Sequence, residues 1–295
     1  MINIAIIWGL IILFILQPGI AHAGAVSGAQ LFVQALLPYL LPYIILTQWL
    51  LKMPNRVQKT PKWRRFMKAY ILGSFGGFPV GAVTVTEMMK SGELSQRQSN
   101  LLLAACHAPG PMFIIGFVGT ELFGDIGQGW KLLAAIHIAN ILFFLIAILL
   151  LLRGSDTDIY DTQLAKTNKG MPLLDAIKES STVIILVATT VIFFSSLGTV
   201  LSNVATSAFT MDTGIAKTVA LSIFEMTSGV KSATDHFYDM AIYPFLVAAI
   251  ISLNGLSIHM QVFVIAKAAN LSMIPYIIGR LWSILLVPII FYFIF

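Results

Sequence analysis

The sequence has little charge and almost no cysteine. Only 11% of its 295 residues are charged, against about 25% in typical soluble domains. Cys106 is the single cysteine, which excludes an intramolecular disulfide. All the polar segments are short, so the chain has no room for a soluble catalytic domain.

Motifs of enzyme chemistry are also missing. The sequence contains no P-loop, no Gly-x-Ser-x-Gly motif, no zinc signature and no cluster of metal ligands. We therefore expect no catalytic residues, no metal and no cofactor, and we predict that the protein is not an enzyme. The pI of 9.3 fits loop charges that orient a membrane protein better than it fits a nucleic-acid partner.

Long apolar runs are what the sequence has instead. Hydrophobic residues make up 58% of the chain, and a membrane-spanning helix needs about 20 apolar residues. Four runs reach this length: 31–51, 131–152, 181–201 and 275–295. The sequence therefore predicts an all-α polytopic protein that crosses the bacterial cell membrane several times, with the lipid bilayer as its surroundings.

The first 30 residues resemble a signal peptide in part. An apolar run at 2–20 is followed by Ala-His-Ala, which is typical of a cleavage site. No Lys or Arg precedes the run, although a signal peptide normally has positive charge there. We expect a retained N-terminal helix and a linker over residues 1–30.

The distribution of Lys and Arg predicts the orientation of the chain. Positive residues concentrate in cytoplasmic loops. In the topology that fits this rule best, loops 52–68 and 153–177 are cytoplasmic, and Arg280 is a further charge on the inner side. The basic residues that then lie outside are Lys131, Lys217 and Lys231.

The same topology divides the chain into two similar halves. Residues 31–152 and 178–295 each read as a helix, a re-entrant hairpin, a broken helix and a final helix. Each half crosses the membrane an odd number of times, so the second half is inverted relative to the first. Such inverted repeats are typical of secondary transporters. The predicted fold is an inverted-repeat, transporter-like core with two re-entrant hairpins and two broken helices, plus an extra N-terminal helix.

The tip of the first hairpin is expected within FGGFPVGAVTVTE, residues 75–87. Glycine permits close backbone approach and positive φ, and proline ends a helix. Unpaired backbone groups at membrane depth are tolerated only inside protein or beside water, so we expect this tip to line a substrate site. Its candidate residues are Gly76, Gly77, Phe78, Pro79 and Gly81. The alternative is a glycine-rich face for helix packing.

The first broken helix carries the segment HAPGP, residues 107–111. Pro109, Gly110 and Pro111 should split the run 101–122 into two half-helices. His107 is a candidate for binding a solute or for proton coupling, because histidine changes charge near neutral pH. The alternative is a histidine that is satisfied by a neighbouring carbonyl.

The second hairpin has its tip at FEMTSG, residues 224–229. An intramembrane charge costs about 2.5–3.5 kcal/mol on the insertion scale, so Glu225 needs a partner, a proton or a substrate. We predict that Glu225 takes part in proton coupling. Thr227 and Ser228 offer hydroxyls to a substrate, or alternatively cap a half-helix.

The second broken helix is interrupted by NGLSIHMQ, residues 254–261. Asn and Gly favour a turn, so the run 240–269 should break here. We expect Asn254, Ser257 and Gln261 to line the same polar site. The alternative is hydrogen bonding between helices, which contributes about 0.6 kcal/mol on average in membranes.

These segments resemble a known family. GGFPVGA, GPMFIIGFVG, FEMTSG and NGLSIHMQ are similar to segments of the sporulation integral membrane proteins of the nucleoside-recognition (Gate) domain superfamily. The likeness covers about residues 30–285. It implies membrane transport, since members have been linked to moving dipicolinic acid, and the wider superfamily has a core similar to that of concentrative nucleoside transporters.

The sequence thus predicts a transporter of a small polar or anionic organic solute, either dipicolinate-like or nucleoside-like. The solute is expected to bind at mid-membrane between the two hairpin tips and the two helix breaks. The alternative function is a non-transporting membrane scaffold in a sporulation-type process, with loop 52–68 as its interaction face; a membrane-embedded enzyme is a third possibility. A homo-oligomer is possible, and no nucleic acid is expected as a partner.

Overall fold

The computed structural model describes residues 2–53, 61–152 and 171–295 of the chain. Within these ranges, every assigned element of secondary structure is a helix. Residues 54–60 of the predicted cytoplasmic loop 52–68, and residues 153–170 of the loop 153–177, lie outside the described residues.

The first half of the chain forms one long helix, a helical hairpin, an interrupted helix and a final helix. The long helix runs through Pro18–Leu31 (α2), a π-helical segment Phe32–Leu36 (η1) and Leu37–Lys52 (α3). The helices that follow are α4 (Lys62–Gly76), α5 (Val80–Lys90), α6 (Gln96–Ala105), the π-helical η2 (Phe113–Leu122) and α7 (Ile126–Leu152).

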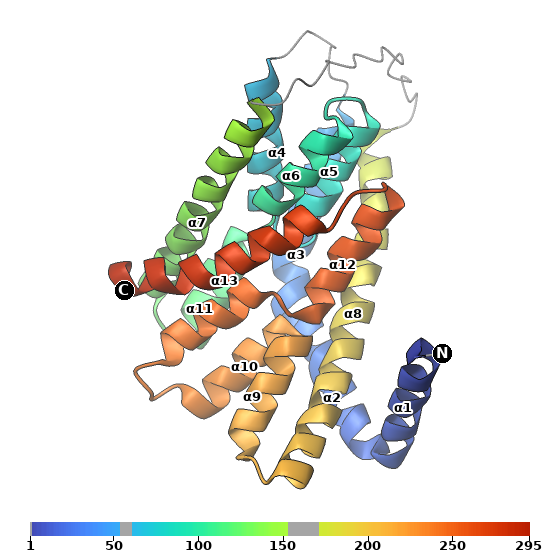
Figure 1. Ribbon diagram of the computed structural model, residues 1–295, viewed down its shortest axis with the longest axis vertical. Coiled ribbons are helices and arrows are strands. Elements are labelled where there is room, and N and C mark those ends of the chain that lie inside the picture. The colour runs from blue at the N-terminus through green and yellow to red at the C-terminus, as the bar shows by residue number, and fades with distance from the viewer. Residues whose placement is uncertain (1, 54–60, 153–170) are drawn as a thin grey trace.

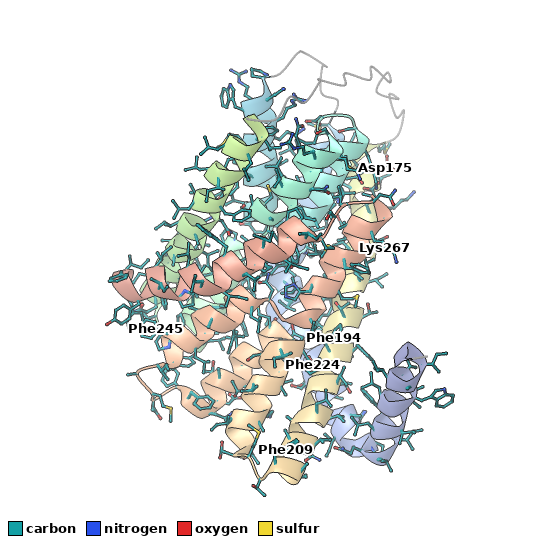
Figure 2. The ribbon with its side chains drawn as sticks, viewed as in Figure 1. Asp175, Phe194, Phe209, Phe224, Phe245 and Lys267 are labelled. Atoms are coloured by element: carbon teal, nitrogen blue, oxygen red, sulfur yellow. The ribbon has the colours of Figure 1, made fainter. Side chains whose placement is uncertain are left out.

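The second half has the same order of elements. Its long helix is α8 (Pro172–Phe209), which runs from Asp175 near one end of the molecule to Phe209 at the other (Figure 2). The helices that follow are α9 (Thr213–Phe224), α10 (Met226–Phe237), α11 (Tyr243–Leu253), α12 (Gly255–Ala268) and α13 (Ile274–Ile294).

Five helical stretches are long and apolar enough to cross a membrane. They are Pro18–Lys52, Ile126–Leu151, Pro172–Phe209, Tyr243–Ala268 and Ile274–Ile294. Each exposes many large hydrophobic side chains, as expected where lipid replaces water around a helix. The chain is therefore an all-α polytopic membrane protein.

The N-terminal region differs from the expected helix at 2–20 and linker to residue 30. Helix α1 (Ile2–Leu16) has 15 residues, fewer than the roughly 20 that a spanning helix needs. Pro18 then starts α2, since proline fits the first turn of a helix, where its missing N–H is not needed. Residues expected to form the linker instead pack α2 against α8: a Cβ on Gly24 would lie 2.9 Å from the Ser196 Cα.

The two hairpins lie at opposite ends of the molecule. Figure 1 shows the ends of the α4–α5 hairpin in the upper part and the ends of the α9–α10 hairpin in the lower part. Lys68 of α4 forms an ion pair of 2.8 Å with Glu93, which follows α5, so the two arms of this hairpin are joined away from its tip. Both tips therefore point toward the middle of the bundle, where α3 and α8 pass each other.

Candidate functional site

The first hairpin tip lies directly on the first helix break. Gly77 has a φ of +79°, and a Cβ added to it would lie 2.8 Å from the Gly110 backbone nitrogen. A Cβ on Gly81 would overlap the carbonyl oxygen of Cys106. Only glycine permits both the positive φ and this close approach, so the predicted breakers bring the turn at 77–79 into contact with residues 106–110.

The second hairpin tip lies on the second helix break in the same way. The break is at Asn254, which has a φ of +70°, and a Cβ added to Gly255 would lie 2.9 Å from the Met226 backbone nitrogen. The turn between α9 and α10 is the single residue Glu225. Each half therefore pairs one hairpin tip with one interrupted helix.

The carboxylate of Glu225 caps the N-terminus of α10. It is 1% exposed, and its Oε2 accepts a hydrogen bond of 2.6 Å from the Ser228 backbone N–H. Ser257 Oγ donates to Oε1 at 3.4 Å. A carboxylate is stabilised at a helix N-terminus by the unpaired N–H groups and the helix dipole. The capping role that the sequence left open for Thr227 and Ser228 thus belongs to the Glu225 side chain.

A cavity lies between the two tips and the two breaks. Its volume is about 30 Å³, whereas one water needs roughly 10–15 Å³ by the same measure. It has room for water but not for an organic solute. Glu225 is the ionisable residue that lines it, and its lining is Leu36, Leu40, Phe78, Pro109, Gly110, Phe113, Val187, Val191, Glu225, Met226, Thr227, Ile258 and Gln261.

The structure divides the predicted site residues into three groups. Six line the cavity: Phe78, Pro109, Gly110, Glu225, Thr227 and Gln261. Seven shape or hold the elements around it: Gly76, Gly77, Pro79, Gly81, Pro111, Ser228 and Ser257. The remaining two, His107 and Asn254, belong to a buried polar cluster beside the cavity.

This cluster joins the first break to α12 and α13. His107 is fully buried, with its ring centroid 4.4 Å from that of Phe78 and 5.1 Å from that of Tyr276. Tyr276 OH is 2.9 Å from His259 Nδ1. In the amide orientation that satisfies its neighbours, Asn254 accepts a hydrogen bond of 3.1 Å from Arg280 Nη1.

Arg280 and Tyr276 are the residues that sequence reasoning missed. Arg280 was expected to be a charge on the inner side of the membrane, but it is only 5% exposed and lies within α13. Its place near one end of an apolar run made it look like a flanking charge. The available signal was that Arg280 is the single charged residue of the run 275–295, and intramembrane charge normally marks a functional site.

Helix α8 also supplies partners that no local pattern indicated. Ser195 Oγ lies 2.8 Å from Ser228 Oγ, and Gln261 Nε2 donates to Thr190 Oγ1 at 2.9 Å. These bonds tie the second hairpin and α12 to the long helix. The alternative reading of Gln261, as a hydrogen bond between helices, therefore holds together with its place in the cavity wall.

Comparison with known proteins gives one distant relative. The chain is similar to the sporulation integral membrane protein YlbJ of Bacillus subtilis (strain 168), with 22% identity over 313 aligned residues, covering 90% of this chain and 75% of the relative. This match supports a sporulation membrane protein family. No protein-family model matches the chain, and no solved structure matches it.

The composition of the cavity wall resembles that of ligand-binding sites. Within residues 2–53, 61–152 and 171–295, no group of three His, Cys, Asp or Glu side chains is placed to hold a metal ion. The cavity wall combines apolar surface with one carboxylate, one amide and one hydroxyl. Ligand sites are usually mostly apolar pockets with a few placed polar groups, and this wall has that composition.

Proposed function

We propose that the chain is a membrane transporter for a small polar or anionic organic solute, with its binding site at the mid-bundle cavity. The observation that carries the proposal is the lining of this cavity. Both hairpin tips and both interrupted helices contribute to it. Interrupted helices around a mid-membrane site are typical of secondary transporters.

The repeated order of elements supports an inverted repeat. The halves 31–152 and 178–295 each contain a long helix, a hairpin, an interrupted helix and a final helix. Their hairpins approach the middle from opposite ends (Figure 1). In a membrane, both hairpins would then be re-entrant, with loops 52–68 and 153–177 on the cytoplasmic side of the bacterial cell membrane.

The small cavity implies a change of shape during transport. A cavity of about 30 Å³ holds water only, so the tips must separate from the breaks to admit a solute. Gly77 lies close to Gly110 and Gly255 lies close to Met226, and in this proposal each of these contacts closes the site on one side. Opening one contact at a time would give the alternating access that carriers of this type use.

Glu225 is the first candidate for proton coupling, and His107 is the second. Protonation of Glu225 would remove the negative charge from the cavity wall and from the N-terminus of α10. An anionic solute would then meet no carboxylate there. Ionisable groups inside membrane proteins commonly form such proton relays.

The relative and the resemblance together define the solutes to test first. The relative's name places it in sporulation, and the resemblance to the nucleoside-recognition (Gate) superfamily suggests dipicolinate-like or nucleoside-like solutes. The experiment is uptake of radiolabelled dipicolinate and uridine by liposomes that contain the purified protein, with and without a pH gradient.

Two substitutions and a matched control make this experiment specific. Glu225→Gln should abolish the effect of the pH gradient, and Pro79→Ala should lower uptake because it alters the first tip. Glu87→Gln is the control, because Glu87 pairs with Lys90 at the surface of the same hairpin. Uptake that is equal in liposomes with and without protein would refute the proposal. It would favour the scaffold role, for which neutralising the charges of loop 52–68 is the direct test.

A further inference from the structure

Arg280 is a buried charge without an acidic partner in the described part of the chain. It is 5% exposed and lies within the candidate span Ile274–Ile294. None of the ion pairs between side chains of the described residues includes Arg280. A buried cation without a counter-charge is costly. Membrane proteins keep such residues mainly where they serve ions, protons or substrates.

The guanidinium of Arg280 is only partly satisfied by neutral groups. Nη2 donates to the Ala104 carbonyl oxygen at 3.4 Å, Nη1 donates to Asn254 at 3.1 Å, and the Tyr276 ring lies 5.7 Å from Cζ. Nε is buried and has no hydrogen-bond partner. A guanidinium has five N–H donors in a planar fork, so donors remain for an additional acceptor.

His107, which also contacts the Tyr276 ring, presents the same deficit. It is fully buried, and neither Nδ1 nor Nε2 has a hydrogen-bond partner. Its ring is held between Phe78 and Tyr276. Buried polar atoms normally have partners, and each exception calls for a cause such as an absent ligand. Arg280 and His107 both contact Tyr276 and both have unpaired buried nitrogens, so they point to one ligand with acceptor atoms.

We propose that Arg280 and His107 form a subsite that binds one carboxylate group of the solute, beside the cavity of the proposed transport site. The inference rests on the proposed function for the role of this ligand, but not for its binding. Arg recognises carboxylates through paired N–H···O bonds. The cavity wall itself carries the Glu225 carboxylate, which would repel an anion, so the anionic end of a solute belongs at Arg280.

Phe78 contacts both this subsite and the cavity. Its side chain lines the cavity, and its ring packs on His107. Phe78 belongs to the first hairpin tip, which is held against Gly110 by close backbone contact. When this tip shifts to admit a solute, the ring moves with it, and the cavity and the Arg280 subsite become one continuous site.

The first test measures ligand binding by the unmodified protein. Purified protein in detergent is heated with acetate or acetamide, and with nicotinate or nicotinamide, so that each pair differs by a carboxylate against an amide. A ligand that binds the folded state raises the melting temperature in proportion to the logarithm of its concentration over Kd. We expect stabilisation by the carboxylates and little by the amides. Equal responses, or none to any carboxylate, would overturn the proposal.

The second test assigns the preference to Arg280. In Arg280→Gln, affinity for nicotinate should fall about 10-fold or more, the loss expected for one charge-assisted contact, while nicotinamide binding stays unchanged. Arg280→Lys should recover part of the loss, because it restores the charge but not the fork. Arg97→Gln is the matched control, since Arg97 is exposed and bonds Leu150 O on the surface. A carboxylate preference that survives in Arg280→Gln refutes the assignment.

Binding and transport fail in distinguishable ways. Carboxylate binding that needs Arg280, in a protein that moves no solute into liposomes, would refute the transporter and leave the subsite standing. Uptake of uridine without any carboxylate binding would refute the subsite and leave the transporter standing.

Discussion

The two hairpins have the same shape but are held in place by different interactions. The second hairpin is tied by side chains: Glu225 caps α10, Ser228 bonds Ser195 of α8, and Thr218 bonds Ser232 across the hairpin at 2.9 Å. The first hairpin has no side-chain cap at Pro79. Its tip is held by the close approach of glycine backbones.

Buried hydroxyls sharpen this contrast. Thr84 and Thr86 of α5 are 0% and 3% exposed, and neither hydroxyl has a hydrogen-bond partner. Helix α10 has one such hydroxyl among the described residues, that of Thr227. Buried unsatisfied groups cost free energy, so α5, which has two, is less well satisfied than α10. We infer that the first hairpin opens more readily than the second, and that its hydroxyls gain partners, such as water, when the site opens.

The largest effect concerns the membrane side of the loop next to each hairpin. It tests whether the two hairpins enter the membrane from opposite sides. In a Cys106→Ala background, we expect Ser91→Cys and Met211→Cys to react with an impermeant thiol reagent from opposite sides of the membrane. Ser91 follows the first hairpin, and Met211 precedes the second. The measurement is labelling of intact cells before and after permeabilisation. Labelling of both from one side would contradict the opposed hairpins.

The next largest effect tests the glycine contacts at the two tips. Gly77→Ala should lower the free energy of unfolding by about 2–5 kcal/mol, since a positive φ costs roughly 1–2 kcal/mol for alanine and overpacking adds about 1–3 kcal/mol. Gly255→Ala, at a φ of +63° and against Met226, should cost about the same.

Gly9→Ala is the control for both substitutions. A Cβ on Gly9 meets no atom within 4 Å, so this change should be neutral or stabilise α1, because alanine favours helix. The measurement is chemical unfolding in detergent. A similar loss of stability in all three variants would show that the two tips do not require glycine more than α1 does.

The sequence located the breaks and tips well, because their causes are local. Proline and glycine act on their own backbone, so the interruptions at 106–110 and at Asn254 follow from the residues present. The partners on α8, such as Ser195, carry no local pattern, since they depend on which helices meet. The close contact of Gly24 with α8 likewise depends on which helices meet, so the helix α2 was not distinguished from a linker.

Charge was the other limit of the sequence reasoning. Arg280 stands near one end of its run, where a flanking charge and a buried one have the same sequence context. Only the packing of α13 against α6 and α11 shows that it is buried. The role of Glu225 as a cap was also hidden, because the helix start at Met226 is not marked by an ordinary capping residue.

A smaller effect is expected from removing the cap of α10, since α5 begins without a side-chain cap. Glu225→Ala should lower the free energy of unfolding by about 1–2 kcal/mol, because the buried Ser228 N–H loses its acceptor. Glu225→Gln should change it by less than about 0.5 kcal/mol, because the amide oxygen still accepts. Chemical unfolding provides both values. Equal losses in the two variants would show that the charge, and not the cap, matters for stability.

The smallest effect tests the hydroxyls themselves. Ser228→Ala removes the bond to Ser195 and should cost about 0.6 kcal/mol, the average for such bonds in membranes. Thr84→Val removes a buried hydroxyl without a partner, so it should leave the closed protein unchanged or more stable. If the Thr84 hydroxyl gains a partner in the open state, Thr84→Val destabilises that state and should also slow solute uptake. Ser228→Ala, at another buried position, should not affect the opening of the first hairpin. A Thr84→Val protein that is less stable than Ser228→Ala would remove the basis for assigning the motion to the first hairpin.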